Sequence, residues 1–322
     1  MGETKQIPDV SLIDVYRARR ALAPFLSPTP LLRSRVLSEQ LGCDLWVKHE
    51  NCSPIRSFKA RGGIYRLLTL DPEYAGVATA STGNHGQGIA LGARLANRKA
   101  VVVVPEQSNP VKVAAIRELG ADLRVAGIDL AAANQIAREI AATEGLLYVE
   151  DGEDAAVMTG CATLTLEILE QLPDLDDLVL PTGGGNLLGA AGLVLGGIAP
   201  GVRLTAIQSE AAPAVHASWT AHQPTWVDRC DTFAGGLSTN YPGAFTYEYW
   251  KSGVDRVDLV SEEDLVSAAL QMVRATGHLP EGAGAAALAG VLADPARYMG
   301  RTVVILLSGS NAEAAILERL GS

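Results

Sequence analysis

The sequence is poor in cysteine and in aromatic residues, and no cysteine pair has the spacing of a metal or redox motif. Phenylalanine, tryptophan and tyrosine together make up 5% of the chain, and there are four cysteines among 322 residues. None of the cysteines forms a C-x-x-C pair, and their spacing is irregular: Cys43, Cys52, Cys161 and Cys230. Such a pattern argues against a disulfide framework or a cysteine metal cluster, and favours reduced thiols in a cytoplasmic protein.

Runs of basic residues and long apolar runs are also missing. The formal net charge is -10, and a nucleic-acid-binding protein would gather lysine and arginine against phosphates, so no nucleic-acid partner is expected. No stretch reaches about 18 uncharged apolar residues, which argues against a membrane span. The first residues lack the basic and apolar regions of a signal peptide. These absences predict a cytoplasmic protein without membrane partners.

Glycine is abundant, with 33 residues, many of them in short clusters between apolar segments. Segments typical of strands alternate with segments of helical periodicity, whereas residues 209–250 show little pattern. We expect strands at 44–50, 76–80, 99–105, 121–127, 146–150, 177–181, 203–208 and 302–308. We expect helices at 11–26, 57–70, 84–96, 109–120, 130–145, 161–172, 186–197, 261–277 and 283–293, and at the C-terminus. The alternation predicts an α/β fold with parallel sheets in two lobes.

Lys59 stands in an unusual setting, the segment SFKARGG at residues 57–63. Ser57 can cap a helix, which would put Lys59 in its first turn. The positive end of the helix dipole disfavours a cation there, and so favours the neutral amine that a Schiff-base lysine needs. The alternative is an ordinary solvated lysine on a helix surface.

Two glycine-containing loops follow predicted strands. The loop STGNHGQG, at 81–88, opens a helix and suits an anion such as a substrate carboxylate, although it could be a simple helix cap. His85 in this loop is a candidate base or a structural histidine. The loop PTGGGNLLGA, at 181–190, fits neither the nucleoside triphosphate pattern nor the dinucleotide pattern. Its three consecutive glycines favour a single phosphate monoester, whereas a tight turn is the plainer alternative.

Two weaker signals lie towards the C-terminus. Glu281 precedes a helix of small residues in LPEGAGAAAL, and Ser308 and Ser310 follow a strand in LLSGSN. A helix cap would explain either one alone. A nucleophilic lysine, an anion loop and a phosphate loop together indicate a phosphorylated aldehyde, and pyridoxal 5′-phosphate supplies both groups as well as an electron sink.

The five segments, in this order and spacing, resemble the serine/threonine dehydratase group of the fold type II (tryptophan-synthase-like) pyridoxal-phosphate enzymes over roughly residues 10–320. Residues 208–219 and 232–243 are most similar to the threonine-dehydratase-like branch that includes the hydroxyectoine-utilisation lyases. The resemblance implies two open, twisted, mostly parallel α/β domains with the cofactor between them. The larger domain would comprise residues 1–75 and 151–322, and the smaller one 76–150. The resemblance also implies a homodimer. The length of the chain predicts no appended regulatory domain.

The resemblance implies a role for each matching residue. Lys59 would form the Schiff base and then move the proton on Cα, with Phe58 against the cofactor ring and Ser308 facing the ring nitrogen. Asn84 would bind the 3-hydroxyl of the cofactor. The remaining cofactor-binding residues would be Glu281 and the phosphate cradle of Gly183, Gly184, Gly185, Asn186 and Leu187. The substrate carboxylate would be held by Ser81, Thr82, Asn84 and His85, and Thr82 is also a catalytic candidate.

The sequence departs from the family pattern at several positions. Arg56 replaces the usual glycine before Ser57, and would either recognise an acidic substrate or point to solvent. Thr82 stands where racemases and dehydratases have serine, which puts racemase activity in doubt. Asn186 replaces the fourth glycine of the cradle and could add a phosphate contact. The positions of a divalent-metal site in some relatives are Gln208, Ala212 and Ala214 here, so we expect no metal there.

These features predict an ammonia-lyase (dehydratase) that eliminates water from an L-β-hydroxy amino acid and releases a 2-oxo acid and ammonia. Threonine, serine, 3-hydroxyaspartate and bulkier substrates all remain open. The alternatives are a β-replacement synthase or an amino-acid racemase on the same fold. A catalytically silent protein that binds pyridoxal phosphate or an amino acid is an alternative of another class.

Overall fold

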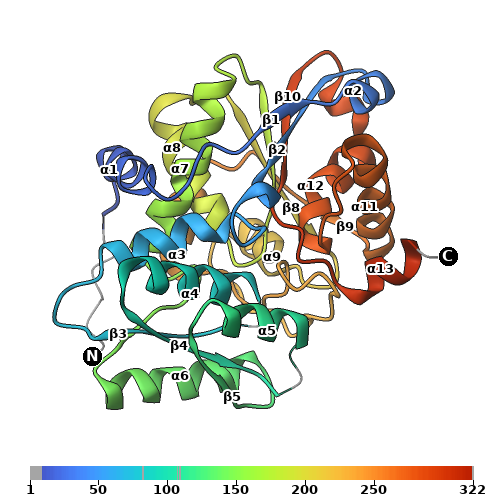
Figure 1. Ribbon diagram of the computed structural model, residues 1–322. Helices are drawn as coiled ribbons and strands as arrows, with labels where there is room; N and C mark the ends of the chain where they lie inside the picture. The colour runs from blue at the N-terminus through green and yellow to red at the C-terminus, as the bar shows by residue number, and fades with distance from the viewer. Residues whose placement is uncertain (1–8, 82, 107, 109, 321–322) are drawn as a thin grey trace.

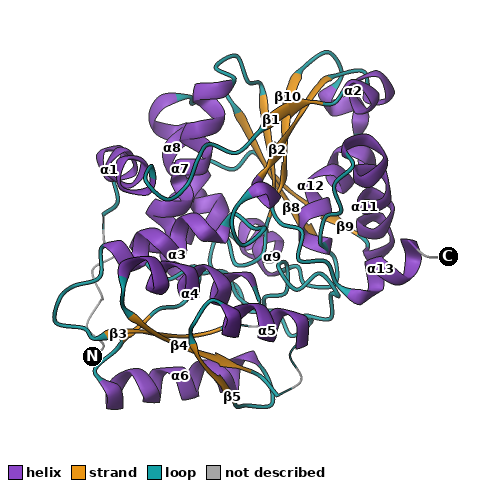
Figure 2. Cartoon of the chain, in the orientation of Figure 1, coloured by secondary structure: helices purple, strands orange, loops and turns teal. Residues whose placement is uncertain are grey.

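The computed structural model describes residues 9–81, 83–106, 108 and 110–320, and contains two β-sheets surrounded by helices (Figure 1; Figure 2). The larger sheet has the strand order β1-β2-β10-β7-β8-β9. All its neighbouring strands are parallel except the pair β1–β2. The strands are β1 (Leu31–Arg33), β2 (Asp44–His49), β7 (Asp177–Pro181), β8 (Arg203–Ser209), β9 (Arg256–Val260) and β10 (Thr302–Leu307).

The smaller sheet is parallel throughout and has the order β5-β4-β3-β6. Its strands are β3 (Gly76–Ala80), β4 (Lys99–Val104), β5 (Asp122–Val125) and β6 (Leu147–Tyr148). The predicted α/β fold with two mostly parallel sheets is therefore confirmed. All strands of the smaller sheet fall within residues 76–150, and the domain boundaries themselves stay a prediction.

The helices cover both faces of the larger sheet and surround the smaller one (Figure 1). In that view α7 and α8 lie on one side of the larger sheet and α11 and α12 on the other, while α6 lies on the outer side of the smaller sheet. The α-helices are α1 (Leu12–Leu22), α2 (Arg35–Leu41), α3 (Lys59–Leu68), α4 (Asn84–Ala96), α5 (Pro110–Glu118), α6 (Leu130–Glu144), α7 (Ala155–Gln171), α8 (Asn186–Ile198), α9 (Ala214–Ala221), α10 (Ala244–Trp250), α11 (Glu262–Thr276), α12 (Gly282–Ala293) and α13 (Ala314–Leu320). No helix in the described part of the chain is long and apolar enough to cross a membrane.

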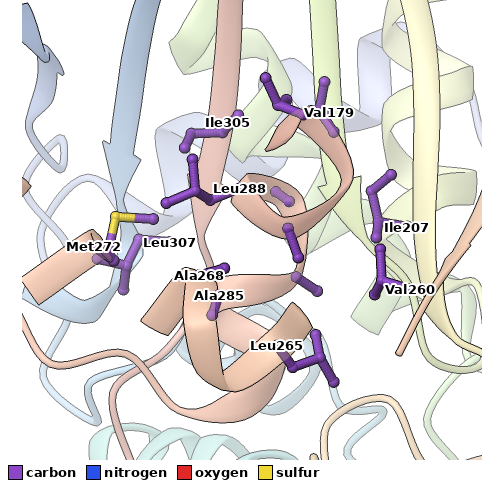
Figure 3. Packing of buried hydrophobic residues seen from close by; sticks show 14 of the residues in the cluster. Val179, Ile207, Val260, Leu265, Ala268, Met272, Ala285, Leu288, Ile305 and Leu307 are labelled. Atoms are coloured by element: carbon purple, nitrogen blue, oxygen red, sulfur yellow. The ribbon is translucent and has the colours of Figure 1, made fainter. Parts of the chain in front are cut away.

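Strand β10 shows how the larger sheet forms two cores. Successive side chains of a strand point to opposite faces, so a sheet covered on both faces needs apolar residues at every position. Ile305 and Leu307 pack with α11 and α12 on one face, as Figure 3 shows. Val304 and Leu306 pack with α7 and α8 on the other. This double burial explains the continuous run TVVILL and fixes the strand whose end carries Ser308.

Helices α3 and α4 approach each other so closely that their backbones touch. A Cβ at Gly63 would lie 2.2 Å from the carbonyl carbon of Gly88, and one at Gly88 would lie 2.4 Å from the carbonyl oxygen of Lys59. Any larger residue would force the two helices apart. The glycines of KARGG and HGQG therefore hold the start of α3 against the start of α4.

Several elements of the structure differ from those predicted from the sequence. Strands β1 and β9 and helices α2, α9 and α10 were not expected, and α7 begins at Ala155 rather than at residue 161. The start of α7 has a clear local cause, because the Asp154 side chain caps it by accepting a hydrogen bond from Val157 N at 2.8 Å. Helix α1 ends at Leu22, before Pro24, rather than at 26. The capping pair of Ser261 and Asp264 at the start of α11 is confirmed.

A buried ionic cluster joins α3, α7 and β2. Lys48 Nζ donates to Glu167 Oε1 at 2.5 Å, and Arg61 bridges Glu167 and Glu50 with its guanidinium nitrogens. All four side chains are at most 6% exposed. Burial alone would raise the pKa of Glu167, but Arg61 and Lys48 outweigh it and lower that pKa to about 2. Each charge in this cluster thus depends on its partners.

Candidate active site

Three loops meet in this structure, each following the carboxyl end of a parallel strand. The first follows β3 and opens α4, the second follows β7 and opens α8, and the third follows β10. Phe58 N donates to Ser308 O at 3.0 Å, which joins the start of α3 to the third loop. Asn311 Nδ2 donates to Asn84 Oδ1 at 2.8 Å, which joins the third loop to the first. Ligands of open α/β folds bind at such strand ends.

Lys59 is the first residue of α3, and Ser57 Oγ accepts a hydrogen bond from its backbone N at 3.4 Å. The side chain is 15% exposed, so Lys59 is not the solvated surface lysine of the alternative interpretation. Its Nζ lies 5.0 Å from the centroid of the Phe58 ring and forms an ion pair with Asp151. The expected place of Lys59 in a first helical turn is confirmed.

Asp151 is the residue of this site that sequence reasoning missed. Its Oδ2 accepts a hydrogen bond from Lys59 Nζ, and its Oδ1 accepts one from Asn186 Nδ2 at 2.9 Å. Burial would raise the pKa of Asp151, but the charge of Lys59 and the hydrogen bonds from Lys59 and Asn186 lower it to about 2, so the carboxylate is ionised. Asp151 follows β6, and that position at the end of a parallel strand was the available signal.

The glycine loop after β7 presents a row of free donors. Within the described residues, the backbone N–H groups from Gly183 to Leu187 donate to no acceptor. A phosphate at the start of α8 would satisfy them and would also meet the positive end of the helix dipole. Gly185 has φ +92, a left-handed conformation in which a side chain is strained. The Asn186 side chain donates to Asp151 Oδ1, and the phosphate contact expected for it stays a prediction.

Replacing Gly185 with alanine should disrupt this cradle. The new Cβ would lie 2.8 Å from Trp250 Nε1 in a backbone conformation that alanine rarely adopts. We expect a loss of about 1–3 kcal/mol in the free energy of unfolding and weaker binding of the phosphorylated cofactor. Urea unfolding and cofactor titration measure the two effects. Gly196→Ala in the same helix is the matched control, since a Cβ there meets nothing within 4 Å, and an equal loss in both variants would contradict the prediction.

The loop after β3 offers fewer free groups than expected. Ser81 Oγ accepts from Gly83 N at 3.1 Å and from Gly86 N at 2.9 Å, and Ser81 N donates to Val103 O. In the described part of the loop, the N–H groups of Asn84 and His85 remain without an acceptor, and they suit a carboxylate. Thr82 lies outside the described residues. Burial lowers the pKa of His85, so its ring is neutral and its role as a base stays a prediction.

Glu281 is the N-cap residue of α12 and contacts residues of α4 and α5. Its Oε1 accepts from Asn84 Nδ2 at 2.6 Å, and Lys112 Nζ lies 3.8 Å from its Oε2. Lys112 Nζ also donates to Glu313 Oε1 at 3.2 Å. Neither Lys112 nor Glu313 was expected here. Glu281 is 1% exposed, and burial raises its pKa to about 7, with Glu313 acting in the same direction and Lys112 opposing it.

The raised pKa of Glu281 predicts a pH effect on stability. The folded protein keeps a proton on Glu281 that the unfolded chain releases near pH 4.5. The stabilisation is therefore complete below about pH 4.5 and is lost as the pH rises through about 7. Compared with Glu281→Gln, the wild type should lose about 3 kcal/mol of unfolding free energy between pH 4.5 and 8. Urea unfolding of both proteins across this pH range measures the difference. If the unfolding free energies of wild type and Glu281→Gln changed equally with pH, the prediction would be wrong.

The structure shows the surroundings of Arg56 and of the three positions that hold a metal in some relatives. The Arg56 side chain is exposed, and its φ of 55 lies in the left-handed region that favours glycine. Gln208 is engaged at both ends, since its Nε2 donates to Gly183 O and its Oε1 accepts from Val215 N. Ala212 and Ala214 are buried and apolar. Across the described chain, no group of three or more acidic, histidine or cysteine side chains is placed to hold a metal.

The residues at this site fit pyridoxal phosphate. The glycine cradle supplies unpaired N–H donors for a phosphate, and Lys59 supplies the amine for an aldehyde. Ser308 is 3% exposed and directly follows β10, where its hydroxyl can meet a ring nitrogen. Phe58 lies beside the lysine and can cover one side of a flat ring.

Comparison with known proteins agrees with this geometry. The family model for pyridoxal-phosphate dependent enzymes matches residues 22–309. An L-threonine ammonia-lyase of Thermotoga maritima is 33% identical over 97% of this chain and 78% of its own. An L-threo-3-hydroxyaspartate ammonia-lyase of Saccharomyces cerevisiae is 31% identical over 93% of each chain. Among solved structures, processed threonine deaminase isoform 2 of Solanum lycopersicum is similar with a TM-score of 0.91 and 28% identity, over 98% of this chain and 94% of its own.

The match covers most of the chain, including Lys59 and the strand-end loops. It confirms the expected cofactor and the expected resemblance to the dehydratases. The chain belongs to the pyridoxal-phosphate dependent enzymes, among relatives that are ammonia-lyases.

Proposed function

We propose that this pyridoxal-phosphate dependent ammonia-lyase eliminates water from an L-β-hydroxy amino acid of the threonine or serine type. The products are a 2-oxo acid and ammonia. The observation that carries the proposal is the position of Lys59, whose Nζ is linked through Asp151 and Asn186 to the start of α8, where the free N–H groups lie. The start of α3, which carries Lys59, is linked to Ser308, because Phe58 N donates to Ser308 O. The relatives named above support the elimination of ammonia over other reactions on this fold.

The cofactor, when bound, supplies the electron sink that makes the proton on Cα acidic. The amine of Lys59 takes that proton and holds it beside Asp151. The N–H groups of Asn84 and His85 bind the substrate carboxylate and so fix which bond at Cα faces Lys59. The donors from Gly183 to Leu187 hold the phosphate. Ser308, a neutral group, leaves the ring nitrogen without a full charge, and this favours elimination of the β-hydroxyl over reactions that need a stronger sink.

The substrate side chain is the part of the proposal that needs a direct test. Purified enzyme is mixed with L-threonine, L-serine and L-threo-3-hydroxyaspartate, and 2-oxo acid release is measured for each. The proposal expects an oxo acid without any added nucleophile. A new amino acid formed with added thiol would indicate a β-replacement synthase, and a D-amino acid would indicate a racemase. No product from any substrate, with cofactor bound at Lys59, would favour the catalytically silent alternative.

A homodimer in the cytoplasm is the further part of this proposal. It rests on the resemblance to the dehydratase group and on the composition of the chain. Light scattering of the purified protein tests the oligomeric state. A monomeric mass at micromolar concentration would contradict the homodimer.

A further inference from the structure

Asp151 lies outside every segment on which the family resemblance rests, yet it contacts the catalytic lysine. It sits between β6 and α7, distant in sequence from Lys59, from the loop after β3 and from the glycine cradle. Its side chain keeps 36% of its surface exposed, although burial is the largest influence on its pKa. The carboxylate is thus surrounded by protein but open on one side, as a group in the wall of a binding site would be.

Both oxygens of Asp151 are engaged in this structure. Oδ2 accepts from Lys59 Nζ, and Oδ1 accepts from Asn186 Nδ2 at 2.9 Å. Asn186 is the first residue of α8, is 4% exposed, and directs its amide nitrogen at Asp151 and, more distantly, at Cys161 Sγ. Asn186 therefore holds the Asp151 carboxylate in a fixed direction. This arrangement explains why an asparagine ends the run of glycines.

The other titratable groups facing Asp151 are uncharged or paired elsewhere. His85 of α4 is kept neutral, because burial lowers its pKa. Burial raises the pKa of Cys161 in α7 to about 12, so the thiol keeps its proton. Glu150, the neighbour in sequence, forms an ion pair with Arg138. Within the described residues, Lys59 is the charged group that Asp151 contacts.

We propose that Asp151 is a positioning residue for the catalytic lysine: it holds Lys59 Nζ and stabilises the ammonium whenever Nζ is not bonded to the cofactor. The role of Lys59 as the base rests on the proposed function. In that role, the lone pair of Nζ takes the proton from Cα, and the electron pair of the broken C–H bond stays with the substrate. Asp151 remains ionised before and after this transfer and gives up no proton.

The experiment measures the reactivity of Lys59 in protein stripped of its cofactor. Acetic anhydride labels neutral amines. Mass spectrometry measures the extent of Lys59 acetylation from about pH 6 to about pH 10, and this extent reports how readily the amine loses its proton. Asp151→Asn keeps the shape of the side chain and removes its charge. We expect Lys59 in this variant to be labelled at least about 10-fold faster than in the wild type near neutral pH, since a contacting opposite charge favours the ammonium strongly.

Two further variants sharpen this measurement. Glu150→Gln removes a charge one residue away that does not contact Lys59, and its labelling should follow the wild type. Asp151→Ala removes the carboxylate without introducing an amide, and it serves if Asp151→Asn does not fold. Labelling of Lys59 at the wild-type rate in a folded Asp151 variant would overturn the proposal, as would an equal increase in Glu150→Gln.

Turnover of the cofactor-loaded enzyme separates this inference from the proposed function. We expect Asp151→Asn to lower kcat by about 10–100-fold with a smaller change in KM, because Asp151 acts on Lys59 after the substrate has bound. A wild-type protein without lyase activity would overturn the proposed function and leave the labelling result intact. Full lyase activity with labelling unchanged in Asp151→Asn would overturn the inference alone.

Discussion

Replacing Lys59 with alanine should lower ammonia-lyase turnover by at least about 1,000-fold, because one change removes both the amine that bonds to the cofactor and the base at Cα. No other lysine lies at the start of α3, and the Asp151 carboxylate accepts from Lys59 Nζ and from Asn186 Nδ2 rather than from a second amine. The variant should still bind the cofactor phosphate through the N–H groups of the glycine cradle. The visible absorbance of lysine-bound cofactor should be lost, and borohydride should attach no cofactor to the peptide that contains position 59.

Lys99→Ala is the matched control for this measurement. Lys99 is 44% exposed, begins β4 and pairs with Glu144 at the end of α6. Its loss should leave the absorbance and the turnover within about twofold of the wild type, as expected for a surface ion pair. Retention of the lysine-bound absorbance in Lys59→Ala would show that another amine holds the cofactor and would contradict the assignment.

The second large effect concerns stability. Glu167→Gln should lower the free energy of unfolding by about 3–5 kcal/mol, because it leaves Lys48 and Arg61 buried beside a neutral side chain. Lys48 is fully buried, and burial already lowers its pKa against the opposing effect of Glu167. Glutamine keeps the volume of the side chain, so the loss reports the charge rather than a cavity. Urea unfolding of the cofactor-loaded protein at neutral pH measures it.

The same helix provides the control and a pH test. Glu170→Gln breaks the Arg19–Glu170 pair, whose side chains are 27% and 47% exposed, and should cost less than about 1 kcal/mol. Because the pKa of Glu167 is lowered to about 2 from 4.5, its stabilising effect is complete above pH 4.5 and is lost as the pH falls through about 2. The difference in unfolding free energy between wild type and Glu167→Gln should therefore become smaller at acidic pH. Equal losses for the two variants would refute the role of the buried cluster.

The features that could be predicted from sequence are those encoded by neighbouring residues. The strand ends followed by glycines, the capping pair at Ser261 and the helix start at Lys59 are all local patterns, and the structure confirms them. Strand β1 was missed because three residues give no periodicity, and β9 because it lies beyond the poorly patterned segment 209–250. Both are edge strands of the larger sheet, where one side needs no partner.

The contacts that complete the site could not be predicted, because they depend on how the two sheets are placed. Asp151, Lys112 and Glu313 each belong to segments without a motif, and their partners are Lys59, Glu281 and Gly282. A single charged residue after a strand is common on protein surfaces. The contacts of these three residues depend on how the fold places the segment after β6, α5 and the segment before α13, and local sequence does not encode that placement.

The left-handed backbone at Arg56 bears on any attempt to redesign this enzyme. Arg56 O accepts a hydrogen bond from Ser310 N at 2.9 Å, so the turn ties the start of α3 to the strand end that carries Ser308. The fold thus demands a backbone shape at position 56, while the exposed side chain is free to vary. A mutant library for new substrates should sample glycine and asparagine at this position. It should exclude β-branched residues, because they are strained in the left-handed region and would distort the turn.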